Sequence, residues 1–208
     1  MSHIVLEHPL VHHKLSFLRD RKTSGSQFRQ LVEEIGLLLA VEATRDLPTE
    51  AVAIETPLER TQAKRLLPLD PVLVPVLRAG LGLVKPFLEL LPTAKVGHLG
   101  LYRDHNTLVP VPYYRNFPPV LEQRQVFVLD PMLATGGSAS EAVRQLKAAG
   151  AVNITLASLL AAPEGIQRVT YDHPELRVVV AAVDRCLNER GYILPGLGDA
   201  GDRMFGTT

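Results

Sequence analysis

The sequence is poor in several residue types, and each shortage excludes a class of protein. Its 208 residues contain one cysteine, Cys186, and no tryptophan. A single cysteine cannot form an intrachain disulfide or a cysteine-based zinc site, and we expect Cys186 to act as a small hydrophobe. No apolar run approaches the roughly 18 residues that span a bilayer, and the amino terminus lacks the basic start and apolar stretch of a signal peptide. We therefore expect a cytoplasmic location and no membrane partner.

An excess of charge is also lacking. The 22 Lys and Arg residues balance 22 Asp and Glu residues, so the net charge is +0. Proteins that coat nucleic acid need a standing excess of basic residues, so we expect no nucleic-acid partner, although a local site for a small anion stays open. The length and the 46% apolar content fit one globular domain over residues 1–208.

Apolar β-like runs alternate with helical runs along most of the chain. Strands are predicted at 51–55, 71–77, 96–102, 125–129, 153–160 and 177–183, and helices at 27–46, 81–91 and 138–149. Ser26 is the predicted cap of the first helix, and Gly150 ends the last. This alternation predicts an α/β fold, with a mostly parallel central sheet and helices on both faces.

Two segments do not follow the alternation. Residues 102–119 carry four prolines and four aromatic residues, which favours an extended β-hairpin arm. Residues 190–208 are glycine-rich, yet they include Ile193 and Phe205, which are too apolar for a loose end. We expect this tail to form part of a site.

The most informative segment surrounds residue 130. An apolar strand, Val126–Leu129, ends in Asp130, and a loop of small and hydroxylic residues then leads into a helix. Ligands of open parallel sheets bind at the carboxyl ends of the strands, and the amides of 135–138 would form an anion nest there. Asp130 is placed to accept hydrogen bonds from vicinal hydroxyls. The alternative is a simple helix cap, and the lack of Gly-Lys-Ser/Thr excludes a nucleoside-triphosphate P-loop.

This segment reads Asp130-Pro131-Met132-Leu133-Ala134-Thr135-Gly136-Gly137-Ser138. It resembles the phosphoribosyl pyrophosphate (PRPP) motif of type I phosphoribosyltransferases. Most members end the strand with two acidic residues, and the Asp-Pro pair here is similar to the uracil phosphoribosyltransferase branch. The resemblance implies that residues 130–138 bind PRPP and that Asp130 holds the ribose hydroxyls. With one carboxylate lost, it also implies a weaker metal dependence of ribose binding.

Two arginines extend the resemblance. Val76-Leu77-Arg78-Ala79-Gly80-Leu81 is similar to the family's diphosphate loop, which implies that Arg78 meets the leaving diphosphate and that Gly80 allows close approach. Arg103 matches a PRPP-contacting arginine. Without the resemblance, Arg103 would be read as a surface charge of the hairpin, and for Arg78 a solvated charge at a strand end stays an open alternative.

The tail resembles the uracil-binding segment of the same branch. Its glycines at 196, 198 and 201 spell G-x-G-x-x-G, but too few residues follow for a dinucleotide fold. The resemblance implies that Ile193, Gly198, Asp199 and Ala200 contact uracil. Asp199 also reaches PRPP and, with Arg78, is a catalytic candidate, although an aspartate here could simply brace the turn.

The resemblance implies transfer of the 5-phosphoribosyl group from PRPP to N1 of uracil, giving UMP and diphosphate. It also implies Mg²⁺ bound with the diphosphate of PRPP, no metal-ligating residues of the protein, a homodimer or higher homo-oligomer, and GTP activation in some members. Two alternatives stay open: a transferase for another base, and a phosphoribosyltransferase-like regulator that binds RNA. The neutral charge counts against the regulator.

Overall fold

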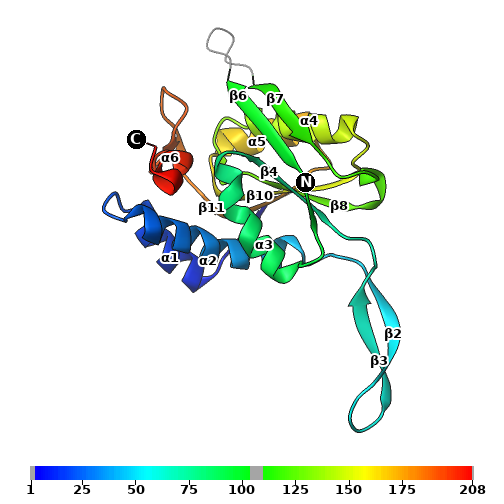
Figure 1. Ribbon diagram of the computed structural model, residues 1–208. Coiled ribbons are helices and arrows are strands. Elements are labelled where there is room, and N and C mark those ends of the chain that lie inside the picture. The colour runs from blue at the N-terminus through cyan, green and yellow to red at the C-terminus, as the bar shows by residue number, and fades with distance from the viewer. Residues whose placement is uncertain (1–2, 104–109, 208) are drawn as a thin grey trace.

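The computed structural model describes residues 3–103 and 110–207, which are built around a nine-stranded sheet (Figure 1). The main strand order is β1 (Ile4–Val5), β11 (Arg177–Val183), β10 (Asn153–Ala161), β8 (Gln125–Leu129), β4 (Val72–Leu77), β6 (His98–Arg103) and β7 (Pro110–Asn116). Two short strands, β5 (Lys95–Val96) and β9 (Met132–Leu133), pair with β4 and β10. Every pairing in this sheet is parallel except that of β6 with β7.

Helices cover both faces of the sheet, as predicted. One face carries α1 (Pro9–Arg19), α2 (Gly25–Ala43), the 3-10 helix η1 (Ala79–Leu83) and α3 (Val84–Leu90). The other carries α4 (Gly137–Ala148) and α5 (Pro163–Asp172) (Figure 1). The central strands are almost continuous Val, Leu and Ala because both of their faces are buried. None of the described helices combines the length and apolar character needed to cross a bilayer.

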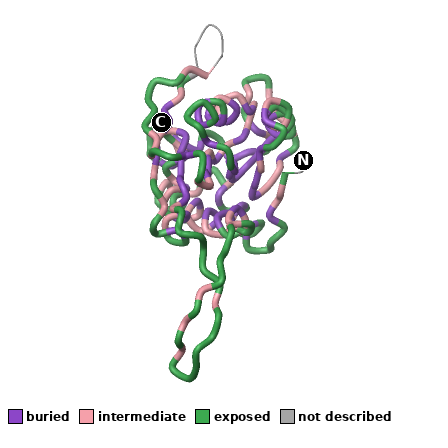
Figure 2. The backbone as a smooth tube through the Cα atoms, turned by 90° about the vertical axis from the view of Figure 1, so that its right-hand side faces the viewer, coloured by how far each residue is buried: buried purple, intermediate pink, exposed green. Residues whose placement is uncertain are grey.

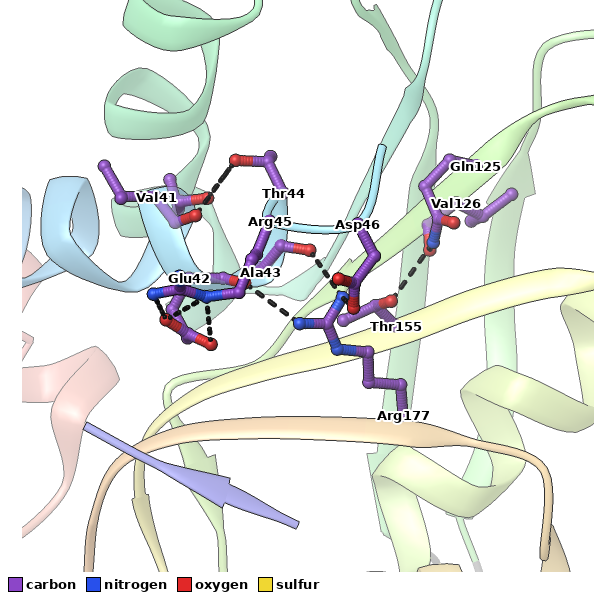
Figure 3. A network of polar contacts seen from close by, with 11 residues as sticks. Val41, Glu42, Ala43, Thr44, Arg45, Asp46, Gln125, Val126, Thr155 and Arg177 are labelled. Carbon is purple, nitrogen blue, oxygen red and sulfur yellow. Dashed lines mark hydrogen bonds and ion pairs between the residues drawn. The ribbon is translucent and has the colours of Figure 1, made fainter. Parts of the chain in front are cut away.

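The ends of α2 are fixed by polar contacts. Ser24, not Ser26, is the N-cap: it forms a capping box with Gln27, which is the more favourable arrangement because it satisfies two backbone donors. At the other end, Arg177 of β11 donates to the carbonyl oxygens of Glu42 and Ala43 and pairs with Asp46 (Figure 3). These contacts tie the long helix to the sheet.

A second hairpin lies outside the central sheet. Strands β2 (Thr49–Glu55) and β3 (Arg60–Leu66) pair only with each other and project away from the body in both views (Figures 1 and 2). The strand predicted at 51–55 is therefore present, but it does not join the parallel sheet. Most of its residues are exposed because the hairpin has no layer of the body against it.

The two irregular segments take up different structures. Strands β6 and β7 form the antiparallel arm expected within 102–119, and residues 104–109 of that arm lie outside the described residues. A 3-10 helix, η2 (Leu121–Gln123), leads from the arm to β8. In the tail, β12 (Cys186–Leu187) pairs with β13 (Ile193–Leu194), and α6 (Ala200–Phe205) packs against α2. We call residues 190–207 the base segment.

Candidate functional site

The site begins where two neighbouring strands end. β4 and β8 run parallel with Pro75 opposite Leu129, so the loops that follow them leave the sheet side by side. A Cβ atom on Gly80 would lie 2.3 Å from the carbonyl oxygen of Leu129. Only glycine allows this approach, so Gly80 brings the Arg78 loop against the end of β8.

An open pocket of about 200 Å³ lies between these loops. Residues 130–138 line it with the exception of Pro131 and Gly137, and Arg78 lines it from the other side. Pro131 is buried, and its carbonyl oxygen accepts the N–H groups of Leu159 and Leu160. The structure thus brings together most of the residues that the sequence predicts for PRPP.

The loop ends in a helix amino terminus. α4 begins at Gly137, and its N-cap Gly136 has a φ of +76° and no side chain that could cap the helix. The N–H groups in the first turn of a helix attract anions, and here no side chain of the cap residue occupies them. This arrangement can bind an anion such as a phosphate group.

Asp130 lines this pocket; the residue as a whole is partly exposed, but its carboxyl group is surrounded by protein. Its Oδ1 lies 3.5 Å from the backbone nitrogen of Met132, which is a long contact. Burial raises the pKa of Asp130 to about 6. The side chain is therefore a carboxylate at neutral pH that is poorly solvated, and incoming hydroxyl donors would stabilise it.

Arg78 points from the pocket toward the base segment. Its Nη2 donates to Oδ1 of Asp202 at 3.1 Å, and its Nη1 lies 3.4 Å from Oγ1 of Thr207. Thr207 also donates to Asp202, and this bond, together with the contact from Arg78, holds the pKa of Asp202 below its ordinary value. Sequence reasoning missed Asp202 as the partner of Arg78, although its place beside Asp199 in a glycine-rich tail was visible.

A second pocket, of about 340 Å³, opens beside the first. It is lined by all four residues predicted to contact uracil: Ile193, Gly198, Asp199 and Ala200. Three residues, Ala79, Met132 and Ala134, line both pockets. The two pockets are therefore adjacent compartments of one cleft.

Asp199 has a structural contact as well as a place on the second pocket. It is the N-cap of α6, and its Oδ1 accepts the N–H of Asp202 at 2.9 Å. Aspartate is among the best N-cap residues, so the bracing of the turn is real. The residue is also exposed and lines the second pocket, so its carboxylate is accessible there.

Two arginines, Arg19 and Arg203, anchor the base segment, and sequence reasoning missed both roles. Arg19 forms a two-bond pair with Asp184 at 2.6 and 2.7 Å, and both residues also bond the backbone of Gly196. Arg203 donates to the carbonyl oxygens of Leu18, Asp20 and Leu197, and its guanidinium lies 4.5 Å from the centre of the Phe28 ring. A charged residue directly after the apolar strand β11, as Asp184 is, was the available signal.

One predicted residue cannot be placed. Arg103 ends strand β6, but its side chain lies outside the described residues. Among the residues that the structure describes, no cluster of three or more His, Cys, Asp or Glu side chains could hold a metal ion. Asp130 is the one carboxylate that lines the first pocket within this described set.

The chain is similar to known proteins over its whole length. The family model for uracil phosphoribosyltransferase matches residues 5–207. Proteins named uracil phosphoribosyltransferase are 54% identical in a Thermoanaerobacter species and 53% identical in Bacillus cytotoxicus, each over 98% of this chain and 97% of the relative. The solved structure of the AQ2163 protein from Aquifex aeolicus has a TM-score of 0.93 at 37% identity and covers 100% of this chain and 99% of its own.

More distant structures share the fold alone. A hypoxanthine-guanine phosphoribosyltransferase from Bacillus anthracis has a TM-score of 0.53 at 11% identity, over 77% of this chain and 80% of its own. This confirms the expected α/β architecture of type I phosphoribosyltransferases. The family match over residues 5–207 and the relatives above 50% identity decide the narrower assignment. The chain belongs to the uracil phosphoribosyltransferase family.

Proposed function

We propose that the protein transfers the 5-phosphoribosyl group of PRPP to N1 of uracil, releasing UMP and diphosphate. The observation that carries this proposal is the divided cleft. One compartment contains the 130–138 loop and Arg78, the other contains the base segment, and Ala79, Met132 and Ala134 form their common wall. A reaction that joins a sugar phosphate to a base needs two such compartments in contact.

The first compartment would hold PRPP. The amides of 135–138 at the start of α4 would bind the 5-phosphate, and Asp130 would accept hydrogen bonds from the ribose hydroxyls. Arg78 would bind the diphosphate, and we keep Arg103 as a further PRPP contact. As the bond from C1 to diphosphate breaks, positive charge develops on the sugar. Catalysis is then mainly positioning and stabilisation of charge.

The second compartment would hold uracil. Gly196 and Gly198 have φ values of +62° and +82°, so the backbone turns sharply there and presents N–H and C=O groups to a flat polar base. Ile193 would contact the face of the ring, and Gly198, Asp199 and Ala200 its polar edge. Asp199 would orient the base or accept its N1 proton, in addition to capping α6.

Mg²⁺ fits this site as an ion carried by the substrate. It prefers a few oxygen ligands together with phosphates and water, and Asp130 is the single carboxylate in the described lining of the first pocket. When bound, the ion would offset the charge of the diphosphate. Arg78 would supply the fixed positive charge of the protein on the same group.

The oligomeric state and the domain organisation are proposed from the family and from the arrangement of the hairpin and the chain ends. The projecting β2–β3 hairpin supports a homodimer or higher oligomer. We also propose that residues 1–208 act as one domain, because β1 pairs with β11 and α6 packs against α2. Activation by GTP and a cytoplasmic location stay predictions from the sequence.

The test is UMP formation from uracil and PRPP with Mg²⁺, against cytosine, orotate, hypoxanthine and adenine. Turnover with uracil alone is the expected result. Turnover with another base would overturn the assignment of the base segment, and no turnover with any base, with GTP present, would overturn the enzymatic proposal. Asp199→Asn keeps an N-cap and Asp199→Ala removes it. If both variants lose activity equally, the carboxylate acts on substrate, whereas loss in Asp199→Ala alone would assign it to the turn.

A further inference from the structure

Helix α5 lies directly against the outer side of residues 133–138, which we call the phosphate loop. A Cβ atom on Gly165 would lie 2.4 Å from the carbonyl oxygen of Ala134. A Cβ atom on Gly136 would lie 2.7 Å from the carbonyl oxygen of Gly165 and 3.0 Å from Cβ of Arg168. Backbone touches backbone here, so a shift of α5 must move the loop.

A cluster of polar side chains joins the far end of α5 to the first turns of α4. The Ser140 hydroxyl donates to Oδ2 of Asp172 at 2.6 Å, and Nε of Arg168 donates to the same oxygen at 2.5 Å. These two bonds, with Ser140 first, hold the pKa of Asp172 below its ordinary value. The Asp172 carboxylate therefore binds Arg168, which lies beside the phosphate loop, and Ser140, which follows the loop in the chain.

The cluster continues through His173. Nε2 of His173 lies 3.0 Å from the carbonyl oxygen of Ser140 and 3.2 Å from its hydroxyl. Lys147 lies 3.0 Å from Nδ1 of His173 and also pairs with Glu175. Ser140 and His173 are 9% and 7% exposed, so these contacts form inside the α4–α5 interface.

The cluster contains serine, histidine and aspartate but is not built for nucleophilic catalysis. In a hydrolytic triad the aspartate bonds the histidine, which in turn bonds the serine. Here Asp172 bonds Ser140 directly, and Ser140 lines neither pocket of the cleft. The side chains are arranged to hold two helices together rather than to attack a substrate.

We propose that Asp172 is a positioning residue for PRPP binding. Its bond to Ser140 of α4 fixes α5 against the phosphate loop, and its bond to Arg168 within α5 holds a side chain that packs beside Gly136. The amides at the start of α4 then keep the geometry that a phosphate requires. This inference rests on the proposed function, in which the phosphate loop takes the 5-phosphate. Asp172 acts through the loop because it lines neither pocket.

The test compares Asp172→Ala with Asp172→Asn, which keeps an oxygen acceptor. We expect Asp172→Ala to raise the KM for PRPP about tenfold, on the scale at which small misplacements of binding groups act, and Asp172→Asn to raise it less. The KM for uracil at saturating PRPP should not change. Ser140→Ala removes the same bond from the other side and replaces Asp172→Ala if that variant does not fold.

Glu42 offers a matched control. It lies in the last turn of α2 and accepts from Arg45, with 18% of its side chain exposed against 22% for Asp172, and it lines neither pocket (Figure 3). Glu42→Ala and Glu42→Gln should leave both KM values unchanged. An unchanged KM for PRPP in both Asp172→Ala and Ser140→Ala, or an equal rise in both KM values, would overturn the inference. Failure of the wild-type protein to use PRPP would overturn the proposed function instead.

Discussion

At the scale of single residues, Asp130 combines a destabilising position with a proposed binding role. Its pKa is raised from 3.8 to about 6 because the carboxylate is buried. An acid whose folded pKa is raised is charged in the folded protein only above that value. Its burial lowers the free energy of unfolding most above pH 6, where the carboxyl is charged in both the folded and the unfolded protein. Below its ordinary pKa the carboxyl is protonated in both states, and burial has no such effect.

The first prediction concerns activity. The kcat/KM for PRPP should fall as pH drops through about 6, because a protonated Asp130 accepts hydrogen bonds from the ribose hydroxyls less well. Asp130→Asn should have low activity without this acidic limb. A pH profile of both proteins measures the effect, and an acidic limb that persists at the same pH in Asp130→Asn would assign it to another group.

The second prediction concerns stability of the same variant. Asp130→Asn should raise the free energy of unfolding at pH 7 by on the order of 2 kcal/mol, since it removes a buried charge. The difference should shrink between pH 6 and pH 4 as the wild-type carboxyl becomes protonated in the folded state. Urea unfolding across this range tests it, and an Asn variant less stable than the wild type at pH 7 would contradict it.

The third prediction concerns Asp202, which holds Arg78 between the two pockets. Asp202→Asn should weaken diphosphate and PRPP binding, because Arg78 loses the charged partner that orients it across the cleft. Stability should change little, since 56% of the Arg78 side chain is exposed and such ion pairs add little to folding. Calorimetric titration of PRPP measures the affinity, and tighter binding in the variant would mean that Asp202 competes with the diphosphate instead.

At the scale of elements, three arginines fasten the base segment to the helices at the start of the chain. Asp184 is 5% exposed at its side chain and is paired with Arg19, so its charge is compensated only while Arg19 is present. Arg203 reaches the end of α1, and Arg29 of α2 donates to the carbonyl oxygen of Met204. These contacts set where the second pocket can form.

The fourth prediction follows from this pair. Arg19→Met should lower the free energy of unfolding by about 3 kcal/mol, because it leaves a buried carboxylate without its partner. The double variant Arg19→Met/Asp184→Asn should recover part of that loss, since the uncompensated charge is gone. Both should raise the KM for uracil more than the KM for PRPP. If the single and double variants are equally stable, other groups compensate the charge of Asp184 when Arg19 is absent, and the prediction is wrong.

The same elements show how far sequence patterns reach. The strands at 72–77, 125–129 and 177–183 were predictable because strands buried on both faces must be apolar throughout. The pocket loop was predictable because its chemistry is local. Helix α5 was not: only three of its ten residues are buried, which gives too weak a period over so short a helix. The contacts of Arg19 and Asp202 join residues more than a hundred positions apart, which no local pattern reveals.

At the scale of the whole molecule, the β2–β3 hairpin is the feature that the body does not explain. A two-stranded hairpin alone is marginally stable in water, and this one projects from the body with most of both strands exposed. Sequence patterns predicted β2 but not β3, because β3 has a single half-buried residue, Ala63, among polar neighbours. Leu58 in the connecting turn is 95% exposed.

These observations support the fifth prediction, that the hairpin is stabilised by a second copy of the chain. Light scattering should give the wild type a mass of at least twice 22.8 kDa. Replacing residues 51–64 by an Asn-Gly turn that joins Glu50 to Arg65, which already pair across the hairpin, should yield a folded monomer. Tyr171→Ser, which removes another large exposed side chain on α5, is the control and should keep the wild-type mass. A wild-type monomer would show that the hairpin is stable without a partner, and a shortened variant that keeps the wild-type mass would show that other surfaces hold the copies together. Either result would contradict the prediction.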